Sequence, residues 1–371
     1  MKIKLKQAFN LQMGKTPARN RPDYWNGENK WISIADIGNT GKFLVKTKES
    51  ITEAGIEGSG IKVVPQGTVI MSFKLSIGKT AITSEDMYTN EAIMAFIDNG
   101  KFAVDTDYLY HLCCGTNWTA GTNKAVMGLI LNKATLLEKE IPLPDINEQH
   151  EIATKLDKID AIIAERQQQL ELIDQLVKSR FIELFGDPVL NQHGWRKVAL
   201  EVNATLLNGR AYKQDELLDS GKYPVLRVGN FFSNRGWYYS DLELDDDKYC
   251  DNGDLLYAWS ASFGPQIWNG GKVIYHYHIW KVLVGEAYNK QFLCKLLEYA
   301  TESLMGDTHG IAMMHLTKSG MEKTEFIVPP IEQQEQFAAF VEQTDKSKLA
   351  VQKGLQELEI LKKSLMQQYF G

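Results

Sequence analysis

The sequence predicts an α+β protein made of two tandem copies of one unit, each a mixed α/β head followed by a long helix. Three observations carry this prediction. The chain is 371 residues long, about twice an ordinary domain. One long stretch recurs without a gap. In both copies, that stretch has the heptad periodicity of a coiled coil.

Composition narrows the class of protein. The chain is 44% hydrophobic and 24% charged, which favours a globular fold over disorder. Its formal charge of −6 excludes a strongly basic, polyanion-coating protein. The four cysteines include no CxxC pair, and adjacent cysteines such as Cys113 and Cys114 rarely form a disulfide, which favours a reducing compartment. The N-terminus lacks the apolar core of a signal peptide. The sequence contains no run of about 18 apolar residues, so no membrane span is expected. We expect a cytoplasmic protein.

The internal repeat defines the domains. Ile141–Gly186 aligns with Phe326–Gly371 at one constant offset, and twelve of the 46 positions are identical. We therefore divide the chain into head 1 (1–140), a first long helix (141–186), head 2 (187–327) and a second long helix (328–371). Head 1 carries 17 basic and 14 acidic residues, whereas head 2 carries 14 and 18. Judged by net charge alone, only head 2, which has more acidic than basic residues, argues against a polyanionic ligand.

The long helices follow from local signals. Prolines at 142, 144, 329 and 330 end the preceding segments, and Asp145 or Asn147 is placed to cap the first helix. Gly186 stops that helix. Each helix of about 37 residues exceeds what its head needs for a core, so we expect the two helices to pair with each other rather than each pack only on its own head. The predicted apolar seam is Ile152, Leu156, Ile159, Ile163, Leu170, Ile173 and Val177, with Phe337, Val341, Val351, Leu355, Leu358 and Leu365.

The heads have the pattern of mixed α/β folds with short strands broken by Gly- and Asn-rich turns. Strands are expected within 30–37, 62–72, 253–259 and 272–284, and helices at 107–114 and 289–305. Gly67 and Gly78 match Gly253 and Gly264 at a second, nearly identical offset. The two heads should therefore share a fold and differ in their loops.

Four loops mix basic, amide and aromatic residues: 15–26, 117–124, 208–213 and 227–239. Arginine and lysine suit phosphates and guanine, and asparagine suits adenine, although such loops are also common on ordinary surfaces.

Catalytic motifs are missing or incomplete. Gly14-Lys15-Thr16 and Gly78-Lys79-Thr80 resemble the end of a phosphate-binding loop, but the required first glycine is replaced by Phe9 and Phe73. His276 and His278 alternate along an expected strand, and without a third ligand they indicate a structural pair rather than a metal site. The Asn/Asp-Pro-Pro-aromatic motif of an amino-methyltransferase is absent, which argues against a fused restriction–methylation enzyme.

These residues resemble the specificity subunit of type I restriction–modification systems over essentially the whole chain. The first copy carries GKTP, WISIADI, PQGTVIMS and IPLPDINEQHEI, and the second carries NGRAYK, YPVLRVGN, GDLLYAWSASFG and VPPIEQQEQF. The most specific mark is the proline turn followed by an Ile-x-x-Gln helix start, present twice. The resemblance implies two target recognition domains, each binding half of a bipartite double-stranded DNA target, and long helices that pair antiparallel as a coiled coil and set the gap.

The resemblance also implies a division of labour. This chain would be non-catalytic and bind no cofactor. Two methyltransferase (modification) subunits would bring S-adenosylmethionine and methylate adenine, and restriction subunits would use ATP and Mg. An adaptor with two protein- or glycan-binding heads stays open as the alternative. The residues that we expect to contact DNA are Lys15, Thr16, Arg19, Arg21, Tyr24, Trp25, Lys74, Lys79, Asn123 and Lys124 in head 1, and Arg210, Tyr212, Lys213, Arg227, Asn230, Asn234, Arg235, Trp259 and Ser262 in head 2.

Overall fold

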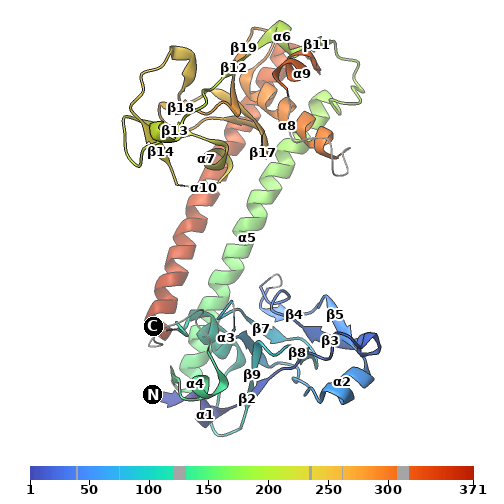
Figure 1. Cartoon of the computed structure of the whole chain (residues 1–371), viewed down its shortest axis with the longest axis vertical. Helices are drawn as coiled ribbons and strands as arrows, with labels where there is room; N and C mark the ends of the chain where they lie inside the picture. Colours follow the sequence, from blue (N-terminus) through green and yellow to red (C-terminus); the bar gives the residue numbers. More distant parts are fainter. Residues whose placement is uncertain (39–40, 75, 120–130, 234–235, 261, 307–316) are drawn as a thin grey trace. The chain divides into compact units, whose positions relative to one another are not determined.

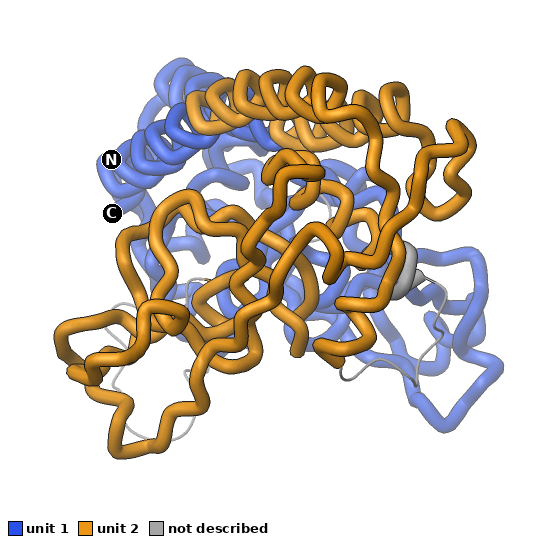
Figure 2. The backbone as a smooth tube through the Cα atoms, turned by 90° about the horizontal axis from the view of Figure 1, so that it is seen from above, with its two compact units in different colours: residues 1–167, 352–371 blue, residues 168–351 orange. Residues whose placement is uncertain are grey.

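The computed structural model describes residues 1–38, 41–74, 76–119, 131–233, 236–260, 262–306 and 317–371 (Figure 1). The chain forms two compact units (Figure 2). Unit 1 contains residues 1–167 and 352–371, and unit 2 contains residues 168–351. Each unit thus combines one head with part of both long helices.

Head 1 is built on two sheets. The five-stranded sheet has the order β2 (Phe9–Met13), β9 (Ile93–Asp98), β6 (Val69–Ser72), β7 (Thr80–Thr83), β4 (Phe43–Leu44). The three-stranded sheet has the order β5 (Glu49–Ile51), β3 (Trp25–Ile32), β8 (Tyr88–Thr89). The helical segments are α1 (Leu5–Ala8), η1 (Pro22–Tyr24), α2 (Glu53–Ser59), α3 (Thr106–Gly115) and α4 (Lys133–Leu137).

Head 2 has two four-stranded sheets. The first has the order β12 (Ala204–Asn208), β19 (Ile279–Val284), β16 (Leu255–Ser260), β17 (Ser262–Ile267). The second has the order β14 (Tyr238–Ser240), β13 (Tyr223–Leu226), β18 (Val273–Tyr275), β15 (Tyr249–Cys250). The helical segments are α6 (Leu200–Asn203), η2 (Gln214–Glu216), α7 (Val228–Phe232), η3 (Asp246–Lys248), α8 (Lys290–Gly306) and α9 (Lys318–Lys323).

The two heads have corresponding first and last strands. In each head, a short first strand pairs antiparallel with the last: β1 (Lys2–Lys4) with β10 (Glu140–Pro142), and β11 (Lys197–Ala199) with β20 (Glu325–Ile327). The offset between the two copies is ten positions larger at the first strands than at the last strands. The stretch between the first and last strands is therefore ten residues shorter in head 2, and no single offset aligns both heads throughout.

Three expected strands are shorter than predicted, and the one expected in 30–37 ends at Ile32. Pro65 and Gly67, which adopts a φ of 75°, interrupt 62–72, so that β6 begins only at Val69. The segment 272–284 is broken into β18 and β19 by a turn in which the N–H of Ile279 donates to the His276 carbonyl at 2.9 Å. The prediction that His276 and His278 alternate along one strand was wrong. They lie at this turn, with ring centroids 4.8 Å apart.

The long helices α5 (Ile146–Phe185) and α10 (Ile331–Phe370) each contain 40 residues. Asp145 caps α5, because its carboxylate accepts the N–H groups of Asn147 and Glu148 at 3.0 Å. Gly186 ends it with a φ of 72°.

A buried glutamine fixes the first turn of each long helix to its head. The Gln149 amide donates to the carbonyls of Ala103 and Pro144 and accepts the N–H of Asp105, at 2.9–3.1 Å. Gln334 makes the same three bonds in unit 2, to Ala287, Pro329 and Asn289. Both copies of the repeat therefore contain the same set of buried hydrogen bonds, made by Gln149 or Gln334, which we call the glutamine clamp.

Ion pairs between α5 and α10 show that the two long helices pair antiparallel. Asp160 of α5 pairs with Lys362 of α10 in unit 1, and Asp174 pairs with Lys348 at 2.5 Å in unit 2. The step forward along α5 from Asp160 to Asp174 equals the step backward along α10 from Lys362 to Lys348, and both steps are two heptads. The thirteen seam residues are buried or half-buried, whereas several apolar side chains off the seam, such as Ile360 at 69%, are exposed.

The far end of each long helix enters the core of the other head. At the end of α5, Phe185 is fully buried in the core of head 2, with its ring centroid 4.7 Å from that of Phe292. At the end of α10, Phe370 joins the core of head 1, 5.6 Å from the ring of Tyr108. A Cβ at Gly115 would approach the Phe370 ring to 2.7 Å, so a glycine is needed there.

No helix among the described residues is both long and apolar enough for a membrane crossing. None of the described residues forms a cluster of three or more potential metal ligands.

The glutamine clamp gives a test of the fold. We expect Gln149→Leu to destabilise unit 1 by roughly 2–4 kcal/mol, because it leaves the Asp105 N–H and two carbonyls without their partner. Hydrogen exchange resolved by segment should show faster exchange in head 1 and unchanged exchange in head 2. Gln167→Leu, an exposed glutamine on the same helix, is the control and should have almost no effect. Equal protection of both heads in Gln149→Leu would contradict the clamp.

Candidate nucleic-acid interface

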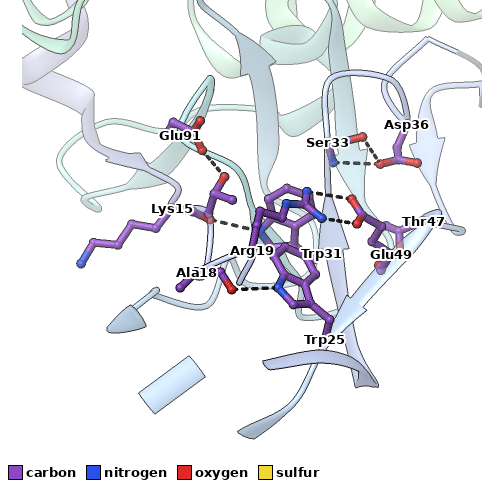
Figure 3. Close-up of polar contacts among 11 residues, drawn as sticks. Lys15, Ala18, Arg19, Trp25, Trp31, Ser33, Asp36, Thr47, Glu49 and Glu91 are labelled. Carbon is purple, nitrogen blue, oxygen red and sulfur yellow. Dashed lines mark hydrogen bonds and ion pairs between the residues drawn. The ribbon is translucent and has the colours of Figure 1, made fainter. Parts of the chain in front are cut away.

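In head 1, the loop that follows β2 is held by two tryptophans. Gly14 begins this loop where a Cβ would lie 2.0 Å from the Thr89 carbonyl oxygen, so that only glycine fits. The indole N–H of Trp31 donates to the Lys15 carbonyl at 3.0 Å, and that of Trp25 donates to the Ala18 carbonyl at 3.2 Å (Figure 3). The two indoles meet edge to face, 5.1 Å apart. The loop is therefore ordered before any ligand binds.

The loop presents Arg19 on an aromatic surface. The Arg19 guanidinium carbon lies 3.9 Å from the ring centroid of Trp25 and 5.0 Å from that of Trp31. Both terminal nitrogens of Arg19 bond the Glu49 carboxylate (Figure 3). This pairing raises the pKa of Arg19. The side chain is thus fixed in direction by Glu49 and in position by the indoles.

Two further carboxylates balance the charge of this loop. Arg21 donates through Nε and Nη2 to Asp23 at 2.9 and 2.7 Å, and this pairing lowers the pKa of Asp23. The Thr16 hydroxyl donates to Glu91. The pKa of Glu91 is lowered, because burial, which raises it, is outweighed by the Thr16 hydrogen bond and by nearby positive charges that include Lys74 and Arg19.

Head 2 has an equivalent loop after β12. Gly209 begins it where a Cβ would lie 2.4 Å from the carbonyl oxygens of Tyr275 and His276. The next residue, Arg210, donates its backbone N–H to the Tyr275 carbonyl at 3.0 Å, as Lys15 does to Thr89 in head 1 at 2.9 Å. Lys15 and Arg210 are therefore structural equivalents. The offset that aligns the first strands of the two heads also aligns Lys15 with Arg210. The offset that aligns the long helices does not.

The Arg210 side chain is also held by a carboxylate. Its two terminal nitrogens bond Glu216 at 2.8 and 2.7 Å, and Glu216 accepts the Lys213 N–H at 2.8 Å. These bonds, that from Arg210 first, lower the pKa of Glu216 to about 2. Arg210 lies 5.2 Å from the ring centroid of Tyr212, which faces the ring of His276 at 6.3 Å. Burial, with the neighbouring charges of His278 and Arg227, lowers the pKa of His276 to about 4, so this ring is neutral near pH 7.

In head 2, a second group of predicted contacts surrounds α7 and the end of β16. Arg227 lies 4.2 Å from the ring centroid of Tyr238, and its buried Nε has no hydrogen-bond partner among the described residues. The Asn230 amide donates to the Gly236 carbonyl at 3.2 Å. Trp259 is half-buried, and its indole N–H donates to the Tyr277 carbonyl at 2.8 Å.

Both heads of the chain match a known family. The family model described as "Type I restriction modification DNA specificity domain" matches residues 1–173 and 193–360. The chain belongs to this family. It is a type I specificity subunit with two target recognition domains, which confirms the resemblance given by the sequence.

Known relatives agree with this assignment. This specificity subunit is 24% identical over 400 residues to the type I restriction enzyme MjaIX specificity subunit of Methanocaldococcus jannaschii, covering 98% of this chain and 90% of that protein. It is 30% identical over 158 residues to the EcoR124I/EcoR124II specificity subunit of Escherichia coli, which is 40% of this chain and 38% of that one. These matches do not favour the adaptor alternative.

Solved structures share the fold. A chain from a study of complex assembly and conformational transition of the type I R-M system superposes with a TM-score of 0.60 at 17% identity, covering 100% of this chain and 97% of that chain. The S subunit from M. genitalium gives 0.57 at 15% identity, covering 100% and 96%. The predicted fold class, a tandem α+β duplication with paired long helices, is confirmed.

The structure brings some of the predicted DNA-contacting residues of this specificity subunit together in one loop and places others elsewhere. Six from head 1 share the tryptophan-held loop or its flank: Lys15, Thr16, Arg19, Arg21, Tyr24 and Trp25. Lys74 and Lys79 lie between β6 and β7. In head 2, Arg210, Tyr212 and Lys213 share the second loop, Arg227 and Asn230 lie at α7, and Ser262 is exposed at the start of β17. Asn123, Lys124, Asn234 and Arg235 lie outside the described residues.

Sequence reasoning missed Trp31, Glu49, Glu91 and Glu216. Trp31 stands in the quoted WISIADI run but was assigned no role. Glu216 is close to Arg210 in the sequence and could have been found as a local partner. Glu49 and Glu91 are 30 and 75 residues from the side chains that they bind, and no local pattern marks them.

Proposed function

We propose that this chain is the non-catalytic DNA reader of a type I restriction–modification complex, with each head binding one half of a bipartite duplex target. The observation that carries the proposal is the repeated loop, in which a basic residue follows a glycine that no other residue can replace. Arginine forks over aromatic rings suit phosphate and guanine edges. The two heads differ in those loops, so the two half-sites should differ in sequence.

The paired helices would set the gap between the half-sites. Forty helical residues extend about 60 Å, which exceeds the diameter of either head alone. Each helix starts at a glutamine clamp on one head and ends at a buried phenylalanine in the other. A spacer anchored at both ends would transmit its length to the DNA as an unread interval.

The helices would also bind two modification subunits. Leu176 and Leu361 are identical in the repeat and yet 51% and 46% exposed, and the repeated serines three positions later are exposed as well. Internal packing does not require these identities, whereas two copies of one partner would. Those subunits would supply S-adenosylmethionine and methylate adenine, and restriction subunits would supply ATP- and Mg-dependent cleavage. Such a complex would act in the cytoplasm, with the DNA.

Methylation mapping tests the reader. The full chain is co-expressed with its modification subunit, and methylated sites are mapped by long-read sequencing. We expect Arg19→Ala with Arg21→Ala to relax one half-site and Arg210→Ala to relax the other, with losses of about 10- to 100-fold at the affected position. Arg196→Ala, at an exposed arginine outside these loops, is the control. An unchanged target in both variants would contradict these contact assignments.

Native mass spectrometry tests the docking of partners. We expect Leu176→Asp and Leu361→Asp each to reduce the number of bound modification subunits from two to one, because a charge replaces an exposed apolar contact. Ile360→Asp is the matched control, since Ile360 is 69% exposed but its counterpart at 175 is glutamine. Two bound subunits in both leucine variants would show that docking lies elsewhere.

A further inference from the structure

The arginines of the predicted DNA loops are already occupied. Of the four that the structure describes, three have two guanidinium nitrogens bonded to one carboxylate: Arg19 with Glu49, Arg21 with Asp23, and Arg210 with Glu216. The fourth, Arg227, lies over Tyr238. The pairing occurs in both heads and in both structurally equivalent loops.

Each carboxylate accepts hydrogen bonds from the same guanidinium N–H groups that would bind DNA. A guanidinium binds a phosphate, or O6 and N7 of guanine, through two parallel N–H groups, and a carboxylate uses the same two groups. One pair of donors cannot serve both acceptors at full strength. A phosphate that approached Arg19 or Arg210 would also face the negative charge of the neighbouring glutamate.

Each of these two carboxylates is less exposed than the arginine that it binds. Glu49 lies on β5, opposite Trp31 of β3 in the sheet register. Glu216 has a side chain only 17% exposed and also accepts the Lys213 N–H. Its pKa of about 2 keeps it ionised wherever DNA binding is measured. The arginines, in contrast, extend from loops and are 54% and 32% exposed.

We propose that Glu49 and Glu216 are guard carboxylates, which compete with DNA phosphates for Arg19 and Arg210 and thereby weaken binding to DNA outside the target. This inference rests on the proposed DNA-reading function. Binding to random sequence depends almost entirely on phosphate contacts, so a competing carboxylate lowers it directly. The target adds base contacts that compensate for displacing the carboxylate, so the target is still bound while binding to random sequence stays weak.

The test compares Glu49→Gln and Glu216→Gln in the complex of the full chain with its modification subunits. Glutamine keeps the size of the side chain and still accepts the Lys213 N–H, so both variants should fold. The dissociation constant is measured for a duplex carrying the mapped target and for one lacking it, over a range of salt concentrations. We expect each variant to bind the non-target duplex about 3- to 10-fold more tightly, with a steeper salt dependence, as one phosphate contact is gained. Affinity for the target should rise by at least the same factor, because target binding no longer has to displace the carboxylate.

Glu138→Gln and Glu243→Gln are matched controls. They remove the same charge from the same units, at exposed carboxylates that pair with Lys4 and Lys6 and with Lys222, outside the predicted loops. Non-target affinity that is unchanged in the guard variants, or that rises equally in the controls, would overturn the proposal. So would a loss of target affinity at constant non-target affinity, which would make the glutamates positioning residues. If the unaltered complex did not prefer its target, the proposed function itself would fail, whatever the variants do.

Discussion

The structure depends on the burial of one phenylalanine at the end of each long helix. Phe185 lies in the core of head 2, and Phe370 lies in the core of head 1, so each helix leaves one head and completes the other. Together with the clamps of Gln149 and Gln334, this fixes both ends of each helix. Loss of a buried phenylalanine side chain costs about 3–5 kcal/mol, more than any exposed ion pair along the helices can replace.

The heads combine a rigid framework with balanced charge. Trp25 and Trp31 order the first loop through their indole N–H groups, and Gly14 and Gly209 allow both loops to approach the sheet backbone. The arginines above this framework are paired with carboxylates, which agrees with the net charge of −6 for the whole chain. A reader of this kind would gain little from general attraction to DNA and would depend on specific contacts.

Periodicity and repetition predicted the elements whose signals are local. The heptad seam from Ile152 to Val177, the cap at Asp145 and the stop at Gly186 all follow from neighbouring residues. Phe185 and Phe370 occupy equivalent positions in the repeat, but their partners Phe292 and Tyr108 are far away in the sequence, so their burial was not predicted. Glu49 was missed for the same reason. The equivalence of Lys15 with Arg210 was hidden because the stretch between the first and last strands is shorter in head 2.

The most direct test of a two-headed reader with a spacer anchored at both ends is the recognition sequence of a shortened chain. Removal of one heptad from each helix, 167–173 and 352–358, preserves the seam and both sets of end contacts. Methylation mapping should then find the same two half-sites separated by a shorter gap, by at most about three base pairs, since seven helical residues span about 10 Å. An unchanged gap would contradict the account.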